Sequence, residues 1–171
     1  MGEPAKYILL VDRISWFRKY AIMMMELHGK RSQPLRGDIF EALPEAEQPS
    51  DGDSIVFKPV KFAQYRLRCS KKDVTRLSDE EANLLLPISC AEKRYATFID
   101  TKRLDFGRRL SPGKAVFISG EGRTKDLPGV VRYKGELPTC PGTMFGVELT
   151  VGINSPIDRP IVWGAVCKLL T

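Results

Sequence analysis

Length, composition and charge already restrict what this chain can be. It has 171 residues, 43% hydrophobic and 28% charged, which is typical of a globular protein with one sizeable core or two small ones. A membrane helix needs about 20 uninterrupted apolar residues, and every apolar stretch in this sequence is much shorter, so no membrane partner is expected. The net charge of +6 favours acidic partners, but the basic residues form no single run, so the charge pattern does not indicate a nucleic-acid partner.

The cysteines and the first apolar run indicate a cytoplasmic protein. The apolar residues 7–11 end at Asp12 and are too few for a signal peptide. His28 is the only histidine, so no metal site is expected. No cofactor is expected either, because the sequence has no Gly-x-x-x-x-Gly-Lys-Ser/Thr phosphate loop and Gly120-x-Gly122 has no third glycine. A reduced compartment is also indicated because the cysteines are scattered and form no Cys-x-x-Cys pair: Cys69, Cys90, Cys140 and Cys167.

The first 53 residues divide into an N-terminal segment, 1–43, and a flexible loop, 44–53. Within the segment, residues 7–11 predict a buried strand, and residues 37–40 mark a return to ordered chain. Residues 16–24 have near-helical apolar spacing, although a strand is also compatible with them. The loop is polar and Pro-rich, so it cannot bury enough apolar surface to offset its ordering entropy.

Residues 54–110 predict strands followed by a helix. Residues 54–58 and 62–67 read as a strand pair. Ser78 and Glu81 fit a capping box at a helix start. Pro87 allows two outcomes: a kink in one helix, or a second helix that begins near it. An apolar stripe at helical spacing follows the capping box: Leu84, Ile88, Ala91, Tyr95 and Phe98.

Residues 111–171 change in character to short strands separated by Gly and Pro. Residues 114–118, 128–133 and 144–149 each predict a strand, and Gly120 to Gly122 predicts a loop. No internal repeat is visible. The predicted class is therefore α+β: an N-terminal α/β segment and a helix, followed by a small antiparallel β-barrel.

The third region also resembles a known family. Residues 113–116, 128–135 and 145–149 are similar to the first half of a CAP-Gly domain, and the clear match covers 113–149. The resemblance implies an SH3-like barrel that binds protein partners, either acidic C-terminal tails or proline-rich segments. Residues 83–95 and 102–104, and more weakly 7–10 and 34–39, resemble the front end of cysteine-type deubiquitinases that carry such modules. That resemblance implies a role in ubiquitin and NF-κB signalling, or an association with the cytoskeleton.

The CAP-Gly resemblance implies a ligand groove in this region. Its candidate residues are Phe117, Arg132, Tyr133, Lys134, Phe145 and Gly146. The three aromatic residues would line the groove, although plain barrel core is an equally good interpretation of them. The two basic residues would favour an acidic ligand. Three further glycines are expected to be structural, at positive φ or at a close backbone approach: Gly113, Gly129 and Gly135.

The match ends after Leu149. Residues 150–160 lack the Gly-Lys-Asn-Asp-Gly stretch with which the family recognises tubulin tails, which argues against direct microtubule binding. The last strands of the family also have no clear counterpart, although residues 161–166 could replace one of them. We therefore expect an incomplete barrel with an exposed edge strand, from a truncated chain.

No catalytic residue is expected in this chain. A thiol protease needs a cysteine activated by histidine, and His28 beside Gly29 reads as a surface residue. One alternative function is a deubiquitinase whose catalytic domain is absent from the chain. Another is a small basic barrel that binds nucleic acid, for which residues 132–134 supply only a fragment of the required basic and aromatic surface.

Overall fold

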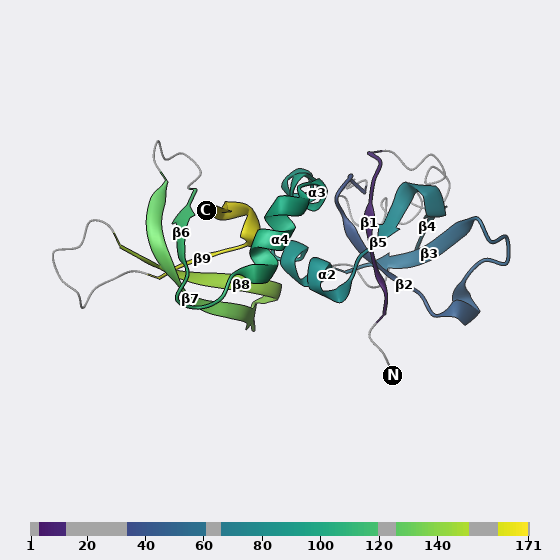
Figure 1. The fold of residues 1–171 in the computed structure, drawn as a ribbon. Coiled ribbons are helices and arrows are strands. Elements are labelled where there is room, and N and C mark those ends of the chain that lie inside the picture. The colour runs from purple at the N-terminus through teal and green to yellow at the C-terminus, as the bar shows by residue number, and fades with distance from the viewer. Residues whose placement is uncertain (1–3, 13–33, 61–65, 120–125, 151–160, 171) are drawn as a thin grey trace, which may run out of the picture. The chain divides into compact units, whose positions relative to one another are not determined.

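The computed structural model describes residues 4–12, 34–60, 66–119, 126–150 and 161–170 (Figure 1). The predictions for residues 16–24, His28 and the Gly120 to Gly122 loop lie outside these ranges. The chain forms two compact units. The first unit consists of Met1–Asp79 and Cys90–Ala96, and the second of Glu80–Ser89 and Thr97–Thr171.

The first unit contains a five-stranded antiparallel sheet in the order β4-β3-β2-β1-β5 (Figure 1). The 3₁₀ turn η3 (Lys71–Asp73) connects the fourth strand to the fifth. The strands are β1 (Lys6–Leu9), β2 (Ile39–Ala42), β3 (Ser54–Pro59), β4 (Leu67–Ser70) and β5 (Val74–Arg76). The strand predicted at 54–58 is β3, and its partner β4 begins at Leu67, where the predicted strand 62–67 ends; residues 62–65 lie outside the described ranges. The sheet joins strands from both sides of the predicted boundaries at 43 and 53.

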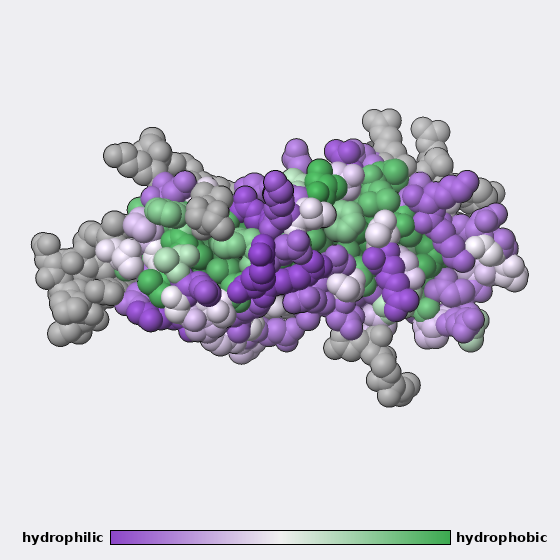
Figure 2. Space-filling view, in the orientation of Figure 1, coloured by the Kyte–Doolittle hydropathy of each residue, from purple (hydrophilic) through white to green (hydrophobic). Residues whose placement is uncertain are grey.

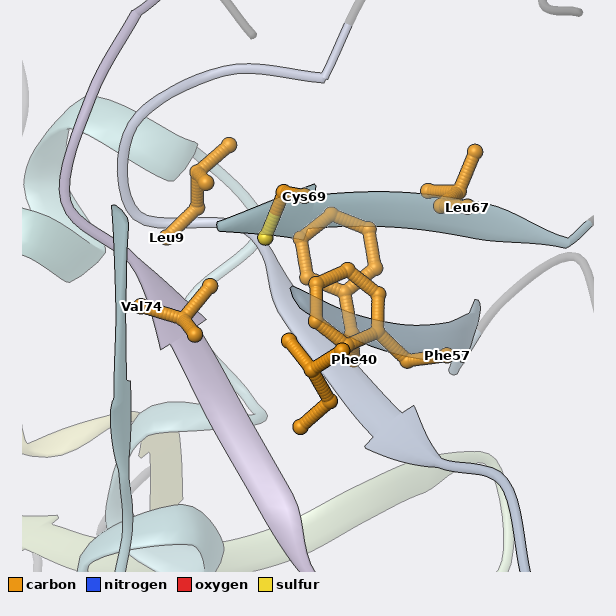
Figure 3. Close-up of a cluster of buried hydrophobic side chains, with 7 residues drawn as sticks. Leu9, Phe40, Phe57, Leu67, Cys69 and Val74 are labelled. Carbon is orange, nitrogen blue, oxygen red and sulfur yellow. The ribbon is translucent and has the colours of Figure 1, made fainter. Parts of the chain in front are cut away.

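A cluster of buried side chains in the first unit lies on one face of this sheet (Figure 3). Alternate residues of a strand point to the same face, so each strand sends one or two side chains into the cluster. Phe40 and Phe57 stack at its centre with ring centroids 4.9 Å apart. The other members are Leu9, Ile55, Leu67, Cys69 and Val74, all buried.

Residues 44–53, predicted to be a flexible loop, contain the 3₁₀ turn η2 (Glu45–Glu47). The side chain of Gln48 then forms hydrogen bonds with backbone groups, as a neighbouring strand would. Its Nε2 donates to the carbonyls of Leu43 at 2.8 Å and Val56 at 2.9 Å, and its Oε1 accepts from the Val56 amide at 2.9 Å. One glutamine therefore attaches this segment to β3.

Three helices follow the first sheet: α2 (Asp79–Leu85), α3 (Ala91–Ile99) and α4 (Thr101–Arg109). The first begins directly after Ser78, where the capping box predicts a helix start. Of the two outcomes allowed at Pro87, the chain takes the second, since one helix ends at Leu85 and another begins at Ala91. Helix α4 was not predicted, and the side chain of Asp100 caps it by accepting from the Arg103 amide at 3.0 Å.

The second unit contains another five-stranded antiparallel sheet, in the order β10-β6-β7-β8-β9. Its inward side chains include Val116, Val131, Phe145, Val147 and Leu169, all buried. The 3₁₀ turn η4 (Val166–Lys168) again precedes the fifth strand. The strands are β6 (Ala115–Ile118), β7 (Leu127–Leu137), β8 (Cys140–Leu149), β9 (Ile161–Gly164) and β10 (Leu169–Leu170).

The two sheets share one topology. Numbered within its own unit, each has the strand order 4-3-2-1-5 and a 3₁₀ turn between the fourth and fifth strands. This structural repeat is not visible as a repeat in the sequence. A sheet of this kind needs only alternating apolar residues and turns, which many different sequences can supply. The predicted α+β class with an open, incomplete barrel is confirmed. Within the described ranges, no helix is long and apolar enough to span a membrane.

A buried glycine of α4 provides a test of the packing in the second unit. A Cβ at Gly107 would lie 2.6 Å from Cγ2 of Val166, which is fully buried. Alanine raises helix propensity by about 1 kcal/mol, but overpacking costs about 1–3 kcal/mol. We expect Gly107→Ala to lower the free energy of unfolding in urea. A Val166→Ala background removes the closest contact of this Cβ and leaves the one with Cδ2 of Leu84 at 3.2 Å, so the same substitution should cost less there. Equal effects in both backgrounds would contradict this packing.

The buried thiol of the first unit provides a second test. Burial, with a smaller contribution from the charge of Asp73, raises the pKa of Cys69 to about 12. The unfolded thiol ionises near 9, so the unfolded state loses its proton first and stability is lost as pH rises from about 9 towards 12. We expect this loss to be smaller in Cys69→Ala. Iodoacetamide should label exposed Cys90 quickly and Cys69 slowly in the folded protein, and equal labelling rates would contradict the burial.

Candidate protein-interaction site

Three strands of the second sheet bring two aromatic side chains together above a glycine. The register places Tyr133 of β7 opposite Gly146 of β8, and Gly146 opposite Trp163 of β9. The two rings meet edge to face with centroids 5.4 Å apart. Tyr133 is 38% exposed and Trp163 43% exposed. We call these two residues the aromatic pair.

Gly146 is required beneath the aromatic pair. A Cβ at this position would lie 2.9 Å from Cζ3 of Trp163 and 3.2 Å from Cβ of Tyr133. Gly135 has a similar role beside Tyr133, because a Cβ there would lie 2.7 Å from the tyrosine Oη. That hydroxyl donates to the carbonyl of Glu136 at 2.8 Å. Two glycines and one hydrogen bond therefore hold the tyrosine ring in place.

The other predicted aromatic residues are not part of this site. Phe145 follows the inward alternation of β8 and is fully buried, so it belongs to the core rather than to a groove. Phe117 is exposed but lies on β6 opposite Pro128, five residues along β7 from Tyr133. At about 3.3 Å per residue, that separation is roughly 16 Å. The predicted groove of Phe117, Tyr133 and Phe145 is therefore not assembled.

The side chain of Lys134 forms hydrogen bonds within the second unit. Its ammonium donates to the carbonyls of Gly107 at 3.0 Å and Arg108 at 2.7 Å, at the C-terminal end of α4. It also lies 5.9 Å from the ring centroid of Phe145. The last carbonyls of a helix are unpaired and carry partial negative charge, so a lysine there satisfies them. This residue anchors α4 to β7 rather than presenting a charge to a ligand.

Arg132 is also engaged. It lies at an irregularity in the β7–β8 pairing and forms an ion pair with Glu148 on the neighbouring strand. The arginine side chain is half exposed, and the glutamate is mostly buried. Both basic residues predicted for an acidic ligand thus have partners within the second unit.

The remaining predicted glycines serve the sheet. Gly113 has a φ of +91° in the turn before β6, a conformation that favours glycine. Gly129 has a negative φ but lies close to β8, since a Cβ would be 2.6 Å from Cγ1 of Val147. These positions shape the sheet that carries the aromatic pair.

The chemistry of the aromatic pair is apolar. Figure 2 shows apolar surface over the second sheet, bordered by hydrophilic side chains. Ile161 of β9, on the same face as Trp163, is also exposed. Among the described residues, no cluster of His, Cys, Asp or Glu is arranged to hold a metal ion. The site offers ring faces, a flat glycine floor and peptide groups.

Sequence reasoning missed Trp163. The run of residues 161–166 was recognised only as a replacement strand. Its one signal was a large aromatic residue among β-branched neighbours in a short strand. Pairing across β8 is what brings Trp163 to Tyr133, and that register is not visible in the sequence.

Comparison with known proteins supports part of the predicted resemblance. The chain is 35% identical over 82 residues to the human ubiquitin carboxyl-terminal hydrolase CYLD, and to the bovine and mouse proteins of that name. The matched part is 46% of this chain and 9% of each hydrolase, so the chain spans about a tenth of the length of these relatives. No family model and no solved structure matches the chain. The chain is CYLD-like over about half of its length.

The different partners of the two basic residues predict different effects on stability. Lys134→Gln removes a charge from the end of α4, and we expect it to lower the free energy of unfolding by about 1–2 kcal/mol. Arg132→Gln breaks a partly exposed pair and should cost less than about 1 kcal/mol. Urea unfolding of both variants measures this. The anchoring role of Lys134 is wrong if its substitution costs no more than that of Arg132.

Proposed function

We propose that this chain is a protein-interaction module of CAP-Gly type in a CYLD-like protein, and that it binds an extended segment of a partner protein on the aromatic pair. The observation that carries the proposal is the exposed Tyr133–Trp163 pair above Gly146. Exposed aromatic rings over a flat floor are what domains that bind polyproline II segments present to their ligands. Tyrosine and tryptophan also supply large contact areas at a small cost in side-chain entropy.

The surroundings of the pair favour a proline-rich or apolar segment over an acidic tail. An acidic tail needs basic side chains with unused charge, and Arg132 and Lys134 are engaged with Glu148 and with the end of α4. A proline ring, by contrast, needs only apolar contact, and a polyproline II segment loses little entropy on binding. The aromatic pair fulfils that requirement without a charge.

The setting of this module rests on the similarity to CYLD. We propose that the module is cytoplasmic and acts in ubiquitin and NF-κB signalling, with association with the cytoskeleton as the alternative. A second candidate, favoured by the name ubiquitin carboxyl-terminal hydrolase that the relatives carry, is a deubiquitinase with its catalytic domain outside this chain. In that case the module would recruit or orient partners for the hydrolase. The chain alone should be inactive under both candidates, so a ubiquitin-chain cleavage assay separates them only when it is run on a longer protein that contains this chain.

Binding is tested with two peptides, one proline-rich and one with an acidic C-terminal tail. We expect NMR shifts of Tyr133 and Trp163 with the proline-rich peptide and a dissociation constant in the micromolar range. Trp163→Ala should weaken binding at least tenfold, which corresponds to about 1.4 kcal/mol. Tyr133→Phe keeps the ring and is the matched control, with an expected change below threefold.

Two results would contradict the proposal. One is that neither peptide moves the resonances of the aromatic pair. The other is that Trp163→Ala binds as well as the unaltered chain. Preferential binding of the acidic peptide would keep the site but reverse the ligand chemistry.

A further inference from the structure

The outer strand of the second sheet has an unusually apolar edge. Strand β9 pairs with β8 on one side, and among the described residues no strand pairs with its other side. Three consecutive large residues of this strand are exposed: Ile161 at 51%, Val162 at 36% and Trp163 at 43%. Their side chains alternate between the two faces of the sheet, so both faces are open at this edge.

None of the usual protective devices is present within β9. Edge strands are normally blunted by charged side chains, proline or a bulge, because their unpaired peptide groups are a template for another strand. Ile161–Gly164 contains no charge and no proline, and its pairing with β8 is continuous. Its residues are β-branched or aromatic, apart from the final glycine, and these types favour strand pairing.

We propose that β9 pairs with β9 of a second copy of this chain, antiparallel, about a two-fold axis at Val162. In that register Val162 lies opposite Val162 of the second copy, and Ile161 lies opposite Trp163 of the second copy. Aromatic and β-branched residues form favourable cross-strand pairs. The strand is thus complementary to itself, as a two-fold interface requires.

The pairing extends the side-chain rows on both faces of the sheet. On the outer face, the row Tyr133, Gly146, Trp163 continues with Ile161 of the second copy. That residue would cover the side of the indole that Tyr133 leaves open. On the inner face, the row Val131, Val147, Val162 continues with the same three valines of the second copy in reverse order. In both rows, the residues that meet across the two-fold axis are apolar.

A second copy explains this edge better than a charged partner does. No side chain of β9 can form an ion pair, so the edge selects for shape and apolar character. Two copies that each carry a net charge of +6 repel one another at low salt. The pairing should therefore strengthen as salt is added, because screening removes the repulsion and leaves the apolar contact unaffected. A four-residue strand forms a small interface, so the dimer should be weak and concentration-dependent.

The first experiment is sedimentation equilibrium of the 171-residue chain over a range of concentrations. We expect the average mass to rise from 19.2 kDa towards twice that value, and to rise further at high salt. Ile161→Lys places a charge on the edge and should keep the chain monomeric at all concentrations. Ile99→Lys replaces another exposed isoleucine, on α3, and should associate like the unaltered chain.

The second experiment tests the two-fold register. Val162→Cys places a thiol opposite its own copy, at a Cα separation of about 4.5–5.5 Å that a disulfide can bridge. In a background with Cys90, Cys140 and Cys167 changed to serine, mild oxidation should crosslink this variant into a dimer. Ile161→Cys would face Trp163 of the second copy instead and should crosslink at least tenfold more slowly.

The outcomes decide the proposal separately from the proposed function. A chain that stays monomeric at high concentration and high salt, or an Ile161→Lys variant that still dimerises, overturns the pairing. Equal crosslinking of both cysteine variants overturns the two-fold register. Because Ile161→Lys retains the aromatic pair, peptide binding by that variant shows whether the ligand site survives when the dimer does not.

Discussion

The site on the second sheet depends on the alternation of β8. Phe145, Val147 and Leu149 turn inward and are buried, which commits Gly146 to the outer face. A one-residue slip would turn the phenylalanine outward and put the glycine in the core, at the cost of several large buried side chains. Core packing therefore fixes the register of β7 and β9 on either side. The aromatic pair exists because that register places Tyr133 and Trp163 next to the one residue of the row that has no side chain.

The two units show how one topology carries two surfaces. In the first sheet, the outer face carries the Glu41–Lys58 ion pair at 3.2 Å, and Arg68 with Asp51. In the second sheet, the corresponding strands β7, β8 and β9 carry the aromatic pair. Surface ion pairs contribute little to stability but keep a face solvated, whereas exposed aromatic rings are unfavourable in water and mark sites of contact. The shared strand order therefore indicates a common framework, while the outer residues show that, among the described residues, an exposed aromatic pair of this kind lies on the second sheet.

Much of the framework could be predicted from local patterns. The strands around 114–118, 128–133 and 144–149 and the helix start at Ser78 follow from alternation, turn residues and capping, which involve only neighbours in the chain. The site could be predicted only in part. Tyr133 and Gly146 were both assigned to strands and to one candidate groove, but their pairing was not predicted. An irregularity at Arg132 and a pairing across three strands decide which aromatic residues meet. Lys134 was misjudged because its partners, the carbonyls of Gly107 and Arg108, belong to a helix that the sequence did not predict.

The position of Trp163 links the ligand site to the edge of the sheet. One side of the indole faces Tyr133, and the strand that carries it is the outermost of the described sheet. In the proposed dimer the aromatic pair moves from the edge of a five-stranded sheet to the middle of a larger one, and each ligand segment gains a neighbouring surface from the second copy. A ligand that contacts only those parts of Tyr133 and Trp163 that Ile161 of the second copy leaves uncovered has equal affinity for monomer and dimer, so it does not shift the association equilibrium. A ligand long enough to reach Ile161 of the second copy binds the dimer more tightly than the monomer. By thermodynamic linkage, the bound ligand raises the association constant of the dimer by the same factor by which dimerisation raises the affinity for the ligand. The length of the bound segment thus determines whether binding and association are coupled.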